Sequence, residues 1–118
     1  MDWIIENDRP IWLQLYEQLT LRIVTGEYAK GGRMPTVREL AAEAGVNPNT
    51  MQRALAHLEE QGLVITNRTA GRQVTEDEEQ IASVRLQLAQ KIISDYLQGM
   101  GVLGYSEEDA VSLLNREE

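Results

Sequence analysis

The sequence predicts a mostly α-helical fold with one small β-hairpin. Apolar residues recur every three or four positions in several segments, which is the pattern of helices with one buried face. Capping patterns mark four helix starts, and one short stretch has the composition of two paired strands. The chain has 118 residues, of which 42% are hydrophobic and 25% charged. This length and composition predict one globular domain with a small appendage.

The composition also excludes several classes of protein. No apolar run approaches the roughly 20 residues that span a bilayer, and residues 1 to 10 are acidic where a secretory signal would be basic, so we expect a cytoplasmic chain. The sequence has no Cys and a single His, His57, so we expect no metal, no cofactor and no enzymatic activity. Gly99, Gly101 and Gly104 match a dinucleotide fingerprint, but the strand that should precede it is missing.

Three helices are predicted in the first half of the chain, over about residues 11–25, 37–44 and 48–61. Pro10 opens the first helix, and Thr36 with Glu39 forms a capping box for the second. Asn47 and Pro48 supply the cap and the first position of the third helix. The second and third helices are therefore joined by a tight turn at Gly45.

A hairpin is predicted directly after the third helix. Residues 63–66 and 72–75 have strand character, and residues 68–71 can turn. Two helices that meet at a tight turn and are followed by a two-stranded hairpin form a winged helix-turn-helix, a fold that suits duplex DNA. We therefore assign residues 1–75 to a winged helix-turn-helix domain that binds DNA.

Residues 76–118 are predicted to form a two-helix arm. Thr75 and Glu78 match a capping box for a long helix that we expect to end near Gln98, where the segment 99–104 (GMGVLG) should break it. Ser106 and Asp109 then cap a short final helix.

The charge of the chain is divided unevenly between these two parts. The net charge is −8, which by itself argues against a nucleic-acid partner. Residues 1–75 carry only −1, however, whereas residues 76–118 carry −7. The first part can therefore present a local basic surface.

The candidate DNA contacts lie on and around the third helix. Asn and Gln side chains pair with adenine and Arg with guanine, while Arg side chains outside the groove hold phosphates. The polar face of the helix and the Arg residues of the flanking loop and hairpin supply these groups. The candidates are Arg33, Arg38, Asn47, Asn49, Thr50, Gln52, Arg53, Arg68, Thr69 and Arg72.

The long helix of the arm carries an apolar stripe that predicts a homodimer. The short final helix is too small to cover this stripe, and a second copy of the chain would bury it. The alternative is that the stripe packs on residues 11–25 of its own chain. The arm also looks too short to build a pocket of about 300 Å³, so any small effector, which remains unknown, should bind at an interface. The stripe consists of Ile81, Val84, Leu88, Ile92 and Tyr96.

Residues 10–74 resemble the DNA-binding domain of the GntR family of bacterial transcription regulators. The matching motifs are PI at 10–11, GEY at 26–28, MPTVRELA at 34–41, GVNPNTMQRAL at 45–55 and GLV at 62–64. The short arm is similar to that of the YtrA subfamily, whose members are dimers without a large ligand-binding domain. The resemblance implies a repressor of its own operon that binds a pseudo-palindromic operator.

The same resemblance implies how the DNA is held, and it also shows where this chain departs from the family. It places residues 47–53 in the major groove, Arg38 on a phosphate or base, and the hairpin tip near the minor groove. Pro48 stands where many members have a base-reading Arg, and Thr69 and Gln73 replace a common Gly and an aromatic residue.

The alternative function is a winged helix that binds a protein, with the acidic arm facing a basic partner.

Overall fold

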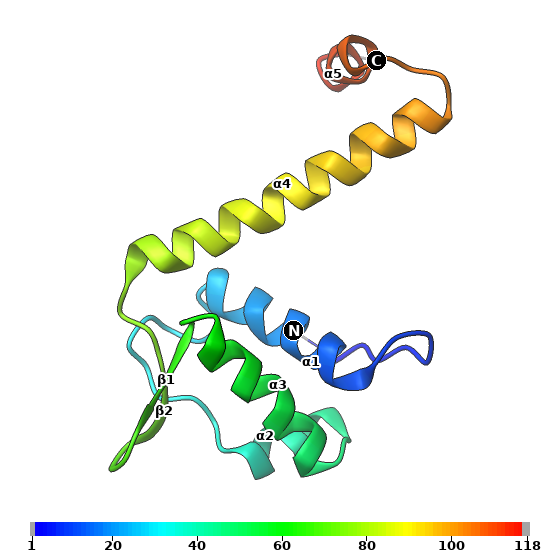
Figure 1. Cartoon of the computed structure of the whole chain (residues 1–118). Helices are drawn as coiled ribbons and strands as arrows, with labels where there is room; N and C mark the ends of the chain where they lie inside the picture. Colours follow the sequence, from blue (N-terminus) through cyan, green and yellow to red (C-terminus); the bar gives the residue numbers. More distant parts are fainter. Residues whose placement is uncertain (1, 117–118) are drawn as a thin grey trace. The chain divides into compact units, whose positions relative to one another are not determined.

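The computed structural model describes residues 2–116 and divides into two compact units, with the boundary between Ala82 and Ser83 (Figure 1). The first unit contains the helices α1 (Ile11–Val24), α2 (Val37–Ala44) and α3 (Pro48–Glu60), followed by the strands β1 (Val64–Asn67) and β2 (Gly71–Val74). The helix α4 (Glu78–Val102) begins in the first unit and continues into the second, which ends with α5 (Glu107–Leu114). The predicted mostly helical fold with one hairpin is confirmed.

The predicted starts of α2 and α3 are confirmed by their hydrogen bonds. The Thr36 hydroxyl accepts from the Glu39 backbone N–H, and the Glu39 carboxylate accepts from the Thr36 N–H, at 3.1 Å each. The Asn47 side chain accepts from the Asn49 N–H at 2.8 Å. Gly45, which ends α2, has a φ of 69°, a backbone conformation that costs a side chain about 1 kcal/mol or more. These local signals fix the turn between the two helices.

The core of the first unit lies where α1 and α2 pack against α3. One stripe of α3 is completely buried, and the strand residues Val64 and Val74, with Leu63 just before β1, add to the same core. Burying a side chain of this size contributes about 1.5 to 3 kcal/mol, so this core fixes the orientation of α3 and leaves its opposite face exposed. The buried residues of α3 are Met51, Ala54, Leu55 and Leu58.

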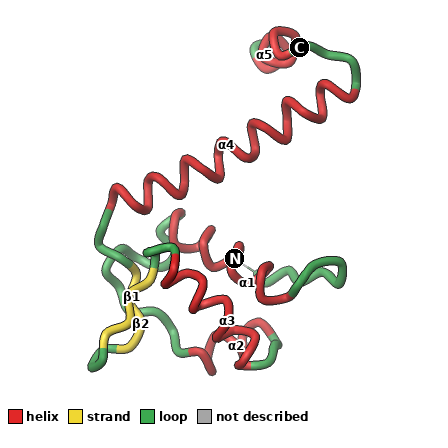
Figure 2. Tube along the Cα trace, viewed as in Figure 1, coloured by secondary structure: helices red, strands yellow, loops and turns green. Residues whose placement is uncertain are grey.

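The hairpin is supported on both sides of β2 (Figure 2). β1 and β2 pair in antiparallel register from Val64 opposite Val74 to Asn67 opposite Gly71. On the other edge of β2, the Val74 N–H donates to the Gly32 carbonyl at 2.9 Å, and the Met34 N–H donates to the Arg72 carbonyl at 2.8 Å. The base of the hairpin is therefore joined to the segment that precedes α2.

An extended segment before α1 is held by two buried or half-buried glutamines. The Gln14 amide bonds to the backbone N–H and carbonyl of Glu6 at 2.7 Å each, and the Gln18 amide bonds in the same way to the backbone of Ile4. Trp3, in the same segment, lies over the Arg22 guanidinium at 3.8 Å from the ring centroid. The two amides thus act as a neighbouring strand would, which the sequence pattern did not indicate.

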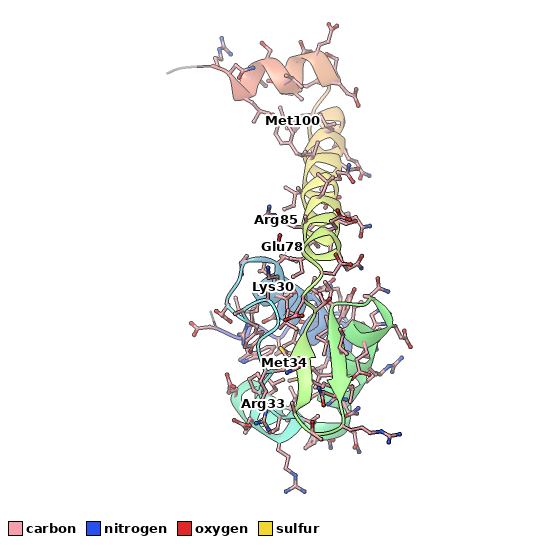
Figure 3. All side chains as sticks on the ribbon, turned by 90° about the vertical axis from the view of Figure 1, so that its left-hand side faces the viewer. Lys30, Arg33, Met34, Glu78, Arg85 and Met100 are labelled. Carbon is pink, nitrogen blue, oxygen red and sulfur yellow. The ribbon has the colours of Figure 1, made fainter. Side chains whose placement is uncertain are left out.

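The predicted start of α4 is wrong by two residues. The Asp77 carboxylate, and not Thr75, accepts from the N–H groups of Glu79 and Gln80, at 3.1 and 3.2 Å. Thr75 is buried at the end of the hairpin, where its N–H donates to the Leu63 carbonyl. Glu78 pairs with Lys30 instead of closing a capping box, and Lys30 lowers the pKa of the Glu78 carboxyl (Figure 3).

The predicted end of α4 is also wrong. The helix continues through Gly99 and Gly101 to Val102, and it stops at Gly104, whose φ is 95°. Glycine lowers helix stability by about 1 kcal/mol, which a helix of this length tolerates. The break needs a residue in the left-handed conformation, and only the last of the three glycines adopts it.

No helix in the described residues is long and apolar enough to span a membrane.

The second unit consists of the C-terminal part of α4 and the short helix α5, and it has little internal core. The predicted capping box of α5 is confirmed, since Ser106 and Asp109 exchange both hydrogen bonds. The Tyr96 hydroxyl donates to the Ala110 carbonyl at 2.7 Å and joins α4 to α5. Among the described residues 83–116, Ala110 alone is buried.

Candidate nucleic-acid interface

The exposed face of α3 lies between the hairpin and α1. Glu59, on one edge of this face, bonds to the hairpin through Thr66 and Arg72. On the other edge, the Arg53 guanidinium lies over the ring of Trp12 on α1, 4.3 Å from the centroid. Asn49 is one turn before Arg53, and at 100° per residue it points between the directions of Arg53 and Glu59. It therefore lies between these two edges. The face therefore has one border on each neighbouring element.

The ten candidate contact residues are not equally available. Asn49, Gln52 and Arg53 are exposed on α3, whereas Thr50 is half-buried. Asn47 is exposed, but its side-chain oxygen accepts the capping bond from Asn49. The donors of the Asn47 amide remain available for a phosphate, which is a smaller role than base reading.

Four of the five arginines between residues 33 and 74 have uncommitted donors. Arg33, Arg38, Arg53 and Arg68 are exposed, and none of them forms a hydrogen bond or ion pair through its guanidinium within residues 2–116. A surface arginine without a carboxylate partner keeps all of its N–H donors for a phosphate or a guanine.

Arg72 differs from the other four because Glu59 holds it. The Arg72 Nε donates to the Glu59 carboxylate at 2.7 Å, and the Thr66 hydroxyl donates to the same oxygen at 2.6 Å. Partial burial raises the pKa of Glu59, but the bonds from Thr66 and Arg72 outweigh it, and the pKa is lowered overall. This carboxylate thus ties both strands of the hairpin to α3.

Three of the predicted phosphate contacts meet at one groove. Arg33, Arg38 and Arg72 line a groove of about 400 Å³ between the first turn of α2 and the hairpin, together with Met34 and other residues of that loop. The Glu39 carboxylate is nearby, and its pKa is lowered by hydrogen bonds from Thr36 and, more weakly, by the charge of Arg33. The groove therefore brings two uncommitted arginines, Arg33 and Arg38, together with Arg72.

The hairpin tip has an internal structure built on Asn67. The Asn67 side-chain oxygen accepts from the Thr69 N–H at 3.0 Å, the Thr69 hydroxyl at 2.9 Å and the Ala70 N–H at 3.3 Å. This Asx turn gives Thr69 a structural role in the hairpin tip. Arg68 is exposed at this tip, as a minor-groove contact requires.

Three residues that shape this interface were not among the sequence candidates. They are Glu59, which bonds to the hairpin, Asn67, which shapes its tip, and Trp12, which stacks on Arg53. A carboxylate seven residues before Thr66 could have indicated the hairpin tie, because that loop is short. The stack of Trp12 on Arg53 joins two helices and leaves no signal in local spacing.

The arm presents the predicted apolar stripe and a second face of mixed polarity. Of the predicted stripe, Leu88 and Ile92 are exposed, while Ile81, Val84 and Tyr96 are half-buried. A second face, with residues spaced three and four apart, lines an open groove of about 590 Å³ together with Tyr105. This groove is open to solvent and encloses no ligand site, so the expectation that a small effector binds at an interface stays a prediction. The helical part of this face consists of Gln90, Ile93, Ser94, Leu97, Gln98 and Gly101.

Comparison with known proteins relates this interface to a family of regulators. The model of the gntR family of bacterial regulatory proteins matches residues 12–74. Two proteins of Bacillus subtilis (strain 168) are similar: the uncharacterized HTH-type transcriptional regulator YhcF is 33% identical over 92% of this chain and 90% of its own length. The HTH-type transcriptional repressor YtrA is 32% identical over 80% of this chain and 77% of its own.

A solved structure agrees over nearly the whole chain. A GntR family transcriptional regulator from Listeria monocytogenes superposes with a TM-score of 0.87 and 33% identity, covering 97% of this chain and all of its own. The relatives are transcriptional regulators and not enzymes. The helix-turn-helix, the hairpin beside it and the short helical arm are therefore those of a DNA-binding transcriptional regulator, and the chain belongs to the GntR family.

Proposed function

We propose that this protein is a dimeric repressor that binds a pseudo-palindromic operator in the promoter of its own operon. The observation that carries the proposal is the set of uncommitted arginines, Arg33, Arg38, Arg53 and Arg68, around the exposed face of α3. A protein-interaction module has no need of this arrangement. A role as a repressor is further supported by the similarity to the B. subtilis repressor YtrA.

The proposed DNA complex places α3 in the major groove. Asn49 and Gln52 then read base edges, with Arg53 beside them, while Thr50 and the Asn47 amide contact the backbone. Arg33 and Arg38 hold the phosphates that flank the groove, and the tip with Arg68 and Thr69 approaches the minor groove. Arg72 supports the hairpin, and the N–H donors that Glu59 does not use add to the phosphate contacts.

The proposed dimer forms through residues 76–118. A helical unit in which Ala110 is the single buried residue among those described has too little core of its own. Leu88 and Ile92 are 37% and 69% exposed, and Val102 and Leu103 more so. A second copy that covers these side chains removes this surface from water. A two-fold dimer also presents two recognition helices to two half-sites.

The proposal is tested with the promoter region of the gene and with a reporter. Purified protein should protect a pseudo-palindromic segment of that region from cleavage, and deletion of the gene should raise transcription of a reporter fused to the promoter. A protein that binds neither this region nor any duplex selected from a random pool would contradict DNA binding. A reporter that falls on deletion would contradict repression and leave the binding intact.

A further inference from the structure

The contacts at the edge of α3 that faces α1 point to a role for Trp12 in DNA binding. Trp12 is half-buried near the start of α1, and two residues of α3 on successive turns flank its ring. The Arg53 guanidinium lies 4.3 Å from the ring centroid, and the His57 ring contacts it edge-on, with centroids 5.4 Å apart and planes at 81°. The ring is therefore held in one place by two residues of the same helix.

The His57 ring is itself fixed by two further contacts. It packs edge-on against Tyr16 of α1, with a centroid distance of 4.5 Å, and its Nδ1 lies 3.1 Å from the Glu60 carboxylate. Tyr16, His57, Trp12 and Arg53 thus form one continuous row across the α1–α3 contact. Arg53 is the exposed end of this row.

A stacked guanidinium keeps its hydrogen-bonding edge free. Trp is the aromatic side chain that attracts cations most strongly, and the attraction acts through the face of the ring. The N–H donors of arginine lie in the guanidinium plane, so stacking consumes none of them. Arg53 has no ion-pair partner among residues 2–116, unlike Arg72, which Glu59 holds. Its side chain is immobilised without being neutralised.

We propose that Trp12 is a positioning residue that orders Arg53 for its contact with DNA. An unrestrained arginine loses side-chain entropy when it is fixed on DNA, and the stack removes part of this cost before the DNA arrives. The proposal rests on the proposed function, because it assumes that the exposed face of α3 meets the DNA. It assigns part of the operator affinity to a residue of α1 that touches no base.

The test is a double-mutant cycle between Trp12→Leu and Arg53→Met. The probe is a duplex selected from a random pool with the wild-type protein. A cation–π contact of this kind predicts that Trp12→Leu weakens binding by about 3- to 10-fold, and that Trp12→Tyr restores it to within about 2-fold. In the Arg53→Met background, Trp12→Leu should have almost no effect. Coupling of this kind is the result that a general loss of packing would not give.

The control is Trp3→Leu, which removes the other tryptophan stacked on an arginine, at Arg22. This stack contains no residue of α3, so its loss should not interact with Arg53→Met. Equal losses for Trp12→Leu in both backgrounds would overturn the proposal, as would tighter binding by Trp12→Leu, which would mean that the stack withholds Arg53. A wild-type protein that selects no duplex would instead refute the proposed function.

A second measurement does not depend on DNA. In a Trp3→Phe background, Trp12 is the single tryptophan, and Arg53→Met should change its fluorescence because a cation leaves the ring. An unchanged emission spectrum would show that the stack is absent in solution and would overturn the proposal. The measurement also remains informative if Trp12→Leu fails to fold.

Discussion

At the scale of single residues, the hydrogen-bond partners of each arginine separate those that are available to contact DNA from the one that supports the hairpin. Arg33, Arg38, Arg53 and Arg68 have uncommitted donors, whereas Arg72 is held by a carboxylate from α3. Sequence patterns supply the residue types but not this division, because Glu59 lies thirteen residues from Arg72 and reaches it only through the fold of the hairpin. The two groups should respond differently to mutation.

Arg38→Ala should weaken binding to all duplexes alike, because a phosphate contact carries no sequence information. Asn49→Ala and Gln52→Ala should instead cost about 1 to 3 kcal/mol on the selected operator and little on random DNA, since each removes a base contact. Titrations of both duplexes by fluorescence anisotropy measure the difference. Equal losses on both duplexes for all three variants would refute base reading by α3.

Glu59→Gln should loosen the hairpin in a pH-dependent way. The pKa of Glu59 is lower in the folded protein than the value of about 4.3 expected when unfolded, so the carboxylate stabilises the fold above that value. The stabilisation is lost as the pH falls through the folded pKa. We expect the free energy of unfolding of the wild type to be about 1 kcal/mol higher than that of the variant at pH 7. The difference should shrink progressively below about pH 4.3.

Urea unfolding at pH 7, 5 and 3.5 measures this effect. Glu43→Gln on the exposed side of α2 is the matched control, because this carboxylate makes no hydrogen bond within the described residues. A constant difference between wild type and Glu59→Gln over the whole range would show that the tie to Arg72 and Thr66 does not depend on the charge.

At the scale of elements, capping chemistry predicted the first unit well and the arm less well. The boxes at Thr36 and Ser106 and the cap at Asn47 all form, because each depends on residues two or three positions apart. The box expected at Thr75 does not form, because the hairpin buries that residue and Asp77 takes its place. Local patterns fail where a tertiary contact competes for the same residue.

The glycines of the arm give a direct test at this scale. Gly99 lies inside α4 with open space where a Cβ would be, so Gly99→Ala should stabilise the protein by about 1 kcal/mol. Gly45→Ala also meets open space but has a φ of 69°, so it should destabilise by a similar amount. Thermal unfolding followed by circular dichroism measures both. A loss of stability in Gly99→Ala would show that the position is packed in the functional assembly.

At the scale of the whole molecule, charge and apolar surface are separated along the chain. Residues 1–75 hold nearly balanced charge with the uncommitted arginines, and residues 76–118 hold most of the net negative charge and the exposed apolar side chains. The first segment therefore suits a negatively charged partner such as DNA, and the second suits an apolar surface such as that of a second copy. Composition predicted this division, but which arginines and which apolar residues are available depends on packing.

The proposed dimer should dissociate when charge enters the stripe of α4. Leu88→Glu/Ile92→Glu places two carboxylates at positions that a second copy would cover, and we expect a monomer at micromolar concentration. Sedimentation equilibrium measures the mass. Gln87→Glu, an exposed position off this stripe, should remain dimeric. A monomeric wild type, or a dimeric double variant, would exclude this interface.

DNA affinity should fall steeply with salt despite the overall charge of −8. Each phosphate that an arginine neutralises releases about 0.9 counterion, so the slope of log affinity against log salt counts the contacts. Removing Arg33 or Arg38 should each lower that slope by about one per protomer. Binding that is independent of salt would contradict contact through phosphates.

The two-sided support of β2 has a consequence for the motions of the hairpin. The amide of Val74 is bonded to Gly32 at the base, whereas the tip residues after Asn67 are held, within residues 2–116, by the Asx turn of Asn67. An amide exchanges its hydrogen for deuterium when its hydrogen bond opens, and weakly supported segments open most often. The amides of the hairpin tip should therefore exchange long before the amide of Val74. The hairpin is then hinged at a rigid root, and its last residues are free to follow the local width of a DNA groove.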